Sequence, residues 1–317
     1  MLAGFACLVF TTAALAQIDD YQKVQKSVVE PVTFKDKGGT PGLWIGAVSS
    51  DWHNTLNWSD GVVPVSTIDV VVPAPPSNQP VISTNHANCK SLTIHPWASL
   101  TIGAYYLTVQ NDLVVHGALN KNSASGLIRV YGNVVWESGS TAGFTENSSF
   151  RVYGDWNFNE GASVNFANGA VDFMGTSDSW IRCYSNNCSF NNLRIYKSLT
   201  AAKVSNLSTH DLVIHGVVFI DTHATLESLS SENILMGGDF GYSGSFDFTK
   251  FNNDGIVIFN GTGHTIDNYG TGSGTFGHLV FSSTAGATVV NGDFNVAGNL
   301  TIELGYFNAG SATITAV

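Results

Sequence analysis

The sequence predicts an all-β fold, a right-handed parallel β-helix (β-solenoid) with about 22 residues in each coil. The first observation is composition, because Val, Ile, Thr, Asn, Gly and Ser dominate and only 12% of the residues are charged. These residue types favour strands and tight turns. The second is a close succession of short alternating runs, and the third is a repeat that becomes visible from about residue 130 onward.

The alternating runs become regular from Cys89 onward. They occupy residues 91–94, 99–102, 106–109 and 112–115, and Gly, Asn, His or Pro bounds each of them. Such spacing leaves no room for the crossover helices of an α/β fold, and no helical period separates the runs.

The repeat appears where Gly132-Asn133 recurs as Gly154-Asp155, an offset of 22 residues. A coil of this length suits a parallel β-helix, in which each turn stacks like residues over like at about 4.8 Å. The register predicts one inward column of nine apolar residues: Val130, Val152, Phe173, Ile195, Ile214, Leu235, Ile258, Val280 and Ile302.

The neighbours of this column should face outward, because side chains alternate along a strand. On one side they are Arg129, Arg151, Asp172 and Arg194, and on the other Tyr131, Tyr153, Met174 and Tyr196. The simpler interpretation is a surface charge ladder, with each pair contributing only tenths of a kcal/mol. The alternative is an Arg/Tyr strip that stacks on sugars or on a partner's surface, formed by Arg129, Tyr131, Arg151, Tyr153, Arg194 and Tyr196.

The N-terminal segment predicts export. Residues 1–16 are apolar and end in Ala14-Leu15-Ala16, as in a signal peptide, although no Lys or Arg precedes the run. The mature chain would begin at Gln17, and residues 17–42 would form a polar spacer. We therefore expect a secreted or cell-surface protein, with no segment long enough to span a membrane as a helix.

Export bears on the cysteines, since disulfides persist in oxidising compartments. Cys183 and Cys188 flank a short loop and are the candidate disulfide, which would contribute about 2 kcal/mol. Cys89 is then left over, and we expect it to be buried as a small apolar residue. The cysteine spacing does not suit a metal site, and no cofactor is expected.

The segment from Trp44 to Pro73 should cap the solenoid. Trp44, Trp52 and Trp58 could instead form an aromatic platform for carbohydrate, but the first coil of a solenoid would otherwise expose its core. Residues 43–88 are predicted to hold this cap and the first strands, and residues 89–317 the repeats, which would continue beyond Val317.

The segment WIGAVSSDWHNTLNWSDGVVP, with the runs at 69–73, 79–82, 89–94 and 98–102, resembles the start of the large secreted β-solenoid repeat proteins of Bacteroidetes. The pieces at 171–193 and 257–279, of the form V-x-F-x-G-T followed by F-x-x-L, are similar to the later repeats of that family. The resemblance covers about residues 43–317. It implies type IX secretion, and it implies an N-terminal fragment because the sorting domain that ends such proteins is missing.

Function is predicted only by class. The net charge of −11 argues against binding of nucleic acid, whose phosphates the surface would repel. Carboxylates are scattered at turns without a catalytic pattern, so we expect a structural or adhesive protein without catalytic activity, a monomeric rod that meets an extracellular polysaccharide or a cell-surface partner. The alternative is a carbohydrate-binding module or a polysaccharide-degrading enzyme of the parallel β-helix type.

Overall fold

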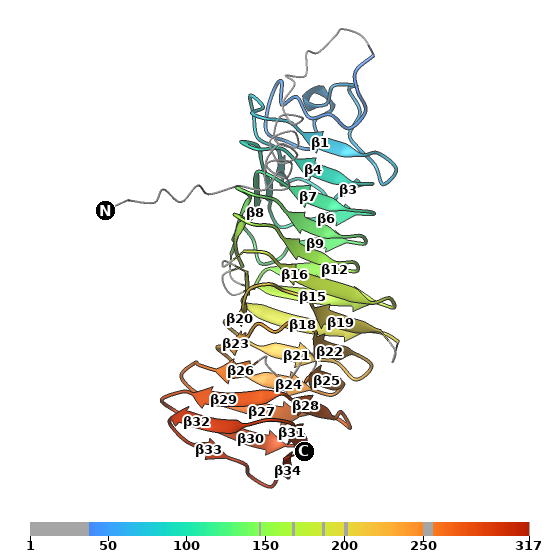
Figure 1. The fold of residues 1–317 in the computed structure, drawn as a ribbon. Coiled ribbons are helices and arrows are strands. Elements are labelled where there is room, and N and C mark those ends of the chain that lie inside the picture. The colour runs from blue at the N-terminus through green and yellow to red at the C-terminus, as the bar shows by residue number, and fades with distance from the viewer. Residues whose placement is uncertain are drawn as a thin grey trace, which may run out of the picture. The chain divides into compact units, whose positions relative to one another are not determined.

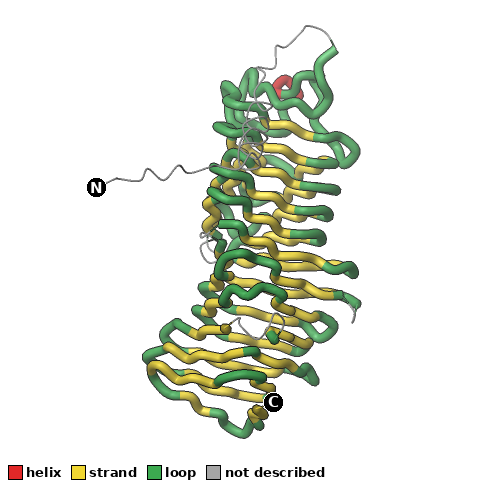
Figure 2. The backbone as a smooth tube through the Cα atoms, viewed as in Figure 1, coloured by secondary structure: helices red, strands yellow, loops and turns green. Residues whose placement is uncertain are grey.

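A computed structural model describes residues 38–145, 147–166, 169–185, 188–199, 202–249 and 256–316. The predicted signal peptide and most of the spacer lie outside these residues. Thr40–Val317 forms one compact unit, in which short parallel strands alternate with turns (Figure 2). Among the described residues, the helical structure consists of one 3-10 turn, Thr55–Asn57. The predicted parallel β-helix is confirmed, with about eleven turns.

Each coil contributes one strand to each of three faces, which we number in the order that the chain meets them (Figure 1). Face 1 is one continuous parallel sheet of β1 (Val70–Val72), β4 (Leu92–Ile94), β7 (Leu113–Val115), β10 (Val134–Trp136), β13 (Trp156–Phe158), β16 (Ser179–Cys183), β19 (Lys203–Asn206), β22 (Thr225–Ser228), β25 (Ser245–Phe248), β28 (Gly274–Phe276), β31 (Phe294–Val296) and β34 (Ile314–Ala316).

Face 2 consists of two separate sheets. The first contains β2 (Val81–Ile82), β5 (Ser99–Ile102), β8 (Ala118–Lys121), β11 (Thr141–Phe144) and β14 (Ser163–Asn165). The second contains β17 (Ser189–Phe190), β20 (Leu212–Ile214), β23 (Ile234–Met236), β26 (Ile256–Phe259), β29 (His278–Ser282) and β32 (Leu300–Leu304). Among the described residues, no backbone ladder joins β14 to β17.

Face 3 is again one continuous parallel sheet. It contains β3 (Ala87–Cys89), β6 (Tyr106–Val109), β9 (Leu127–Val130), β12 (Ser149–Val152), β15 (Ala170–Gly175), β18 (Asn192–Lys197), β21 (Val218–Ile220), β24 (Phe240–Tyr242), β27 (His264–Asn268), β30 (Ala287–Asn291) and β33 (Phe307–Asn308). Faces 1 and 3 therefore hold the stack together along its whole described length.

The strand pairing confirms the repeat and shows that its length varies. Val70 pairs with Leu92, 22 residues later, and the usual length of one coil is roughly 22 residues. The longest interval on face 1 runs from Phe246 to its partner Gly274. Most extra residues enter at the corners, where they leave the ladders intact, and within the described ladders the register shifts only where β27 pairs with β30 and where β29 pairs with β32.

The predicted inward column is correct in its first four members and wrong thereafter. Val130, Val152, Phe173 and Ile195 stack in register and are fully buried. Ile195 then pairs with Ile220. Ile214, the next residue of the predicted column, belongs to β20 on face 2. The remaining four residues of the column also lie on face 2: Leu235, Ile258, Val280 and Ile302.

The error has a physical cause. Each coil carries three strands with the same alternation, so a variable corner shifts the apparent register from one face to another. On face 2, Leu235 pairs with Ile258 and Ile258 with Val280, but Leu235 and Ile258 are half-buried and lie on the outward side of their strands. Ile302 is 49% exposed.

Trp44, Trp52 and Trp58 form a fully buried cluster at the start of the stack. The Trp58 ring meets those of Trp44 and Trp52 edge-on, with centroid distances of 5.0 and 4.8 Å. The Trp58 Nε1–H donates to the Trp52 carbonyl oxygen at 2.8 Å. The expectation of a cap is met, since the three indoles are core residues and present no open aromatic platform.

The cap joins the first coil through backbone hydrogen bonds. The Trp44 N–H donates to the Val71 carbonyl, and the Trp52 N–H donates to the Val81 carbonyl. Asn57 holds the loop between the tryptophans, because its buried side chain accepts from the Ser49 N–H and donates to the Asp51 carbonyl. The cap is therefore an irregular turn stacked on β1 and β2.

Candidate functional site

The Arg/Tyr strip runs across four coils of face 3. Strand pairing places Arg129 beside Arg151, Arg151 beside Asp172 and Asp172 beside Arg194, as the alternation predicted. The three arginines are half-buried, with their side chains on the outer side of the sheet. The ladder thus carries three cations for one carboxylate.

Asp172 is shared by two of the arginines. Its side chain is only 4% exposed, and Arg194 Nε donates to Oδ1 at 2.6 Å while Arg151 Nε lies 3.7 Å from Oδ2. Arg129 has no such carboxylate among the described residues, and its buried Nε–H has no hydrogen-bond partner there. The strip therefore carries uncompensated positive charge on a chain whose net charge is −11.

Aromatic rings follow the arginines along the same face. The rings of Tyr131 and Tyr153 are in contact, with centroids 4.6 Å apart and planes tilted by 34°. Tyr196 lies 5.8 Å from Phe219, which lies 6.0 Å from Tyr269, and Tyr131 and Tyr269 are 43% and 63% exposed. The Arg194 guanidinium also sits over the Tyr196 ring, 5.9 Å from its centroid. Together they form a mixed cationic and aromatic surface.

A groove of about 650 Å³ opens on this strip. Arg151, Asp172, Arg194 and Tyr196 line it, and the following corner adds Asp221 and His223. Its lining combines two arginines, two aspartates and an aromatic ring, so it can offer a ligand both charged hydrogen bonds and a surface for stacking.

Lys197 borders the groove but points into the wall of the solenoid. Its side chain is buried, and Nζ donates to the Met174 carbonyl and to Ser179 Oγ at 2.9 and 2.8 Å. Burial lowers the pKa of the amine to about 8, against the opposing effect of nearby carboxylates. Lys197 therefore supports the corner between β15 and β16 and offers little charge to a ligand.

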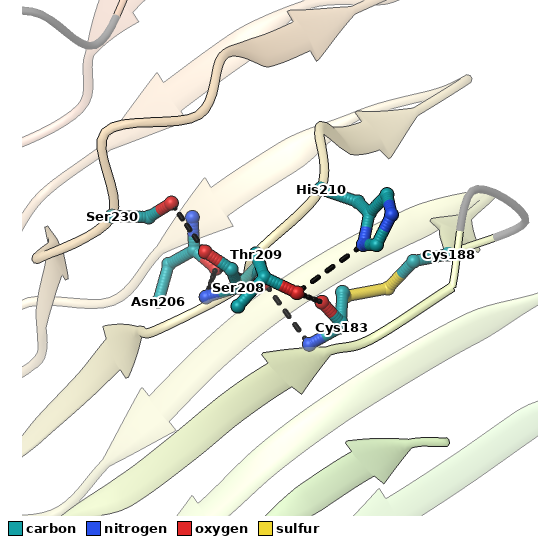
Figure 3. The surroundings of a disulfide bond; sticks show 7 residues. All are labelled: Cys183, Cys188, Asn206, Ser208, Thr209, His210 and Ser230. Atoms are coloured by element: carbon teal, nitrogen blue, oxygen red, sulfur yellow. Dashed lines mark hydrogen bonds between the residues drawn. A yellow bond between two sulfur atoms is a disulfide. The ribbon is translucent and has the colours of Figure 1, made fainter. Parts of the chain in front are cut away.

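Cys183 and Cys188 are joined by a disulfide at the corner between β16 and β17 (Figure 3). Both are buried, and polar side chains of the next coil fix the same corner. Ser208 Oγ accepts from the Cys183 N–H, and Thr209 Oγ1 donates to the Cys183 carbonyl. Cys89 is a buried free thiol, as expected, and burial raises its pKa to about 12.

A second groove lies at the edge between faces 1 and 2 and was missed from the sequence. It has a volume of about 450 Å³, and Trp97, His116, Ser138 and Thr141 are among its lining residues. Trp97 is 85% exposed and has φ = 67°, a backbone conformation that costs a non-glycine residue roughly 1–2 kcal/mol.

A comparison of turns within the sequence would have revealed this residue. The turns His95-Pro96-Trp97-Ala98, Glu137-Ser138-Gly139-Ser140 and Asn159-Glu160-Gly161-Ala162 each close with a hydrogen bond from the fourth N–H to the first carbonyl. Their third residues all have positive φ, and the other two are glycine. Turns of this geometry favour glycine there, so a tryptophan is the exception.

The described residues contain no group of three or more His, Cys, Asp or Glu side chains placed to hold a metal ion. Within the same ranges, the structure has no helix that is long and apolar enough to cross a membrane.

Comparison with known proteins gives one family similarity. Residues 43–159 are similar to a family described as a domain of unknown function (DUF8693). The match spans the tryptophan cap and the coils through β13, and it includes Trp97 together with Arg129, Tyr131, Arg151 and Tyr153 of the strip. No curated protein and no solved structure matches the chain.

Proposed function

We propose that this protein is a secreted or cell-surface solenoid with a structural and adhesive role, and that it is not an enzyme. The observation that carries the proposal is the Arg/Tyr strip on one continuous sheet, where three arginines lie beside a row of aromatic rings and only Arg151 and Arg194 are paired with a carboxylate, that of Asp172. A rigid face of this kind can hold a long ligand across several coils at once.

An extracellular site of action is supported by two features. The apolar N-terminal run ends in a small-x-small pattern, and the Cys183–Cys188 bond is of a kind that persists in oxidising compartments. Export by the type IX route, as in the surface proteins of Bacteroidetes, is part of the proposal and rests on the sequence resemblance alone.

Asp172, the carboxylate of the strip, is not placed to act as a catalytic acid or base. A general acid or base must be free to exchange a proton with a substrate, whereas this carboxylate is buried between Arg151 and Arg194. The alternative of a polysaccharide-degrading enzyme draws on Asp221 and His223, which line the same groove. Incubation with polysaccharides and measurement of newly formed reducing ends separates the two, because adhesion releases none.

The adhesive role is tested by replacing Arg129, the arginine without a carboxylate partner. We expect R129A to bind an immobilised polyuronate about tenfold more weakly than the natural chain, since one charge-assisted contact is worth about 1.5 kcal/mol. The matched control is R182A, which removes the same charge from face 1, where Arg182 pairs with Asp155 at 2.7 Å. Equal binding by R129A, R182A and the natural chain would refute the assignment of the strip.

A further inference from the structure

The groove beside Trp97 owes its shape to a difference in corner length. The corner between β4 and β5 spans residues 95–98, the next one, between β7 and β8, spans 116–117, and the third, between β10 and β11, spans 137–140. A two-residue corner thus lies between two four-residue corners. The longer turns protrude on either side of the shorter one, and the hollow between them is the groove.

Gly117 keeps the floor of this hollow low. A Cβ atom at Gly117 would overlap the carbonyl oxygens of His95 and Ala98, so no larger residue fits against the preceding turn. On the far side, Ser138 and Gly139 are exposed. The floor of the groove is therefore set by the backbone.

Trp97 forms the opposite wall, and the fold gives no reason for its presence. The equivalent positions in sibling turns are Gly139 and Gly161, which adopt the same backbone conformation without strain. The indole is 85% exposed, so it adds almost nothing to the core. A large apolar side chain at a position suited to glycine, and left in solvent, indicates a contact outside the chain.

The chemistry of the groove selects the class of ligand. No Lys, Arg, Asp or Glu is among its lining residues, which include the hydroxyl groups of Ser138 and Thr141 and the imidazole of His116. A flat apolar ring beside small hydrogen-bonding groups matches a sugar ring, which has an apolar C–H face and a rim of hydroxyl groups. An anionic ligand would find no counter-charge among these lining residues.

We propose that this groove binds a neutral polysaccharide, with one sugar ring stacked on Trp97 and its hydroxyl groups hydrogen-bonded by Ser138, Thr141 and His116. The site goes beyond the adhesive role assigned to the Arg/Tyr strip. It lies at the edge between faces 1 and 2, whereas the strip lies on face 3. The two sites differ in charge, so the first would take uncharged glycans and the second acidic ones.

The test measures the affinity of the mature chain for neutral hexose and pentose oligosaccharides by titration calorimetry. We expect W97G to bind at least tenfold more weakly, and W97F, which keeps a ring, to lie between W97G and the natural chain. W97G should fold normally because sibling turns carry glycine, and an unchanged circular dichroism spectrum and melting temperature verify this. The matched control is W180A, since Trp180 is a half-buried tryptophan on β16, and its affinity should be unchanged.

Four results would overturn the proposal. Three are equal affinity of W97G and the natural chain, equal losses in W97G and W180A, and failure of every neutral glycan in the panel to bind. The fourth is a dimer of the natural chain that W97G abolishes in sedimentation, which would assign Trp97 to a contact with a second copy of the chain. R129A should leave neutral-glycan binding unchanged, so failure here and failure of the Arg/Tyr strip are distinguishable.

Discussion

Substitution of Trp58 by alanine tests whether the tryptophan cluster acts as the cap of the stack. The side chain is 1% exposed, and an indole buries roughly 150–250 Å², which corresponds to about 4–6 kcal/mol at ~25 cal/mol/Å². The lost hydrogen bond to the Trp52 carbonyl adds about 1 kcal/mol, while residual burial in the unfolded chain reduces the sum. We expect a loss of about 4 kcal/mol, within the usual range for such a truncation.

The assay is native-state hydrogen exchange, because the loss should be local. In a solenoid each coil contacts only its neighbours, so the cap can open without unfolding distant coils. The Trp44 and Val81 amides, which bond across the junction of cap and first coil, should exchange about a thousandfold faster in W58A. Amides of β22 and β25 should keep their natural rates.

Two outcomes would refute this reasoning. Unchanged exchange at Trp44 and Val81 would mean that the cluster does not hold the cap. Equal acceleration in β22 and β25 would mean that the solenoid opens as one unit. W180A is the control, because Trp180 is only half-buried. Its ring lies under the Arg182 guanidinium, whose Cζ is 5.7 Å from the ring centroid. The effect of W180A should stay below about 1 kcal/mol.

Three further substitutions test individual contacts by denaturant titration. D172N should lower the unfolding free energy by about 2 kcal/mol, because Arg151 and Arg194 lose a buried partner, and the loss should shrink in high salt; no salt dependence would contradict the ion pairs. Burial lowers the pKa of Lys197 to about 8, so at this residue the unfolded chain binds more protons than the folded chain between about pH 8 and 10.5, and the contribution of Lys197 to the unfolding free energy should rise with pH across that window by about 3 kcal/mol. K197M should remove this rise, and an identical pH profile would refute the assignment. C188S should lower the unfolding free energy by about 2 kcal/mol because it removes the disulfide. Dithiothreitol should lower the unfolding free energy of the natural chain by the same amount and should not change that of C188S.

The sequence was sufficient to predict the fold class and one face of the candidate site. Alternation identified the strands, and the interval between Gly132 and Gly154 identified the coil. The same alternation placed Arg129, Arg151 and Arg194 on one outward ladder, which the strand pairing confirms. These features follow from local periodicity, which survives any uncertainty about corners.

Features that depend on corners could not be predicted in the same way. The predicted inward column is wrong from Ile214 onward, because the residue stacked on Ile195 is Ile220. The coil between them is longer than 22 residues, so the fixed interval led to Ile214 on face 2 instead of face 3. Trp97 was overlooked because its importance lies in a backbone angle, and that angle becomes visible only when its turn is aligned with those of Gly139 and Gly161. Corner length and turn geometry are set by local packing and carry no period of their own.

The interruption of face 2 has a mechanical consequence. In the described part of the chain, two backbone ladders join the coil of β14 to the coil of β17, whereas three ladders join the other coils between β4 and β33. Under a pulling force along the stack, this layer should part first. The Cys183–Cys188 disulfide closes the corner that leads into β17, so the residues between the two cysteines cannot extend when the strands separate. An adhesive solenoid built in this way would separate at one defined layer under force, and the coils on either side would stay folded and bound to their ligand.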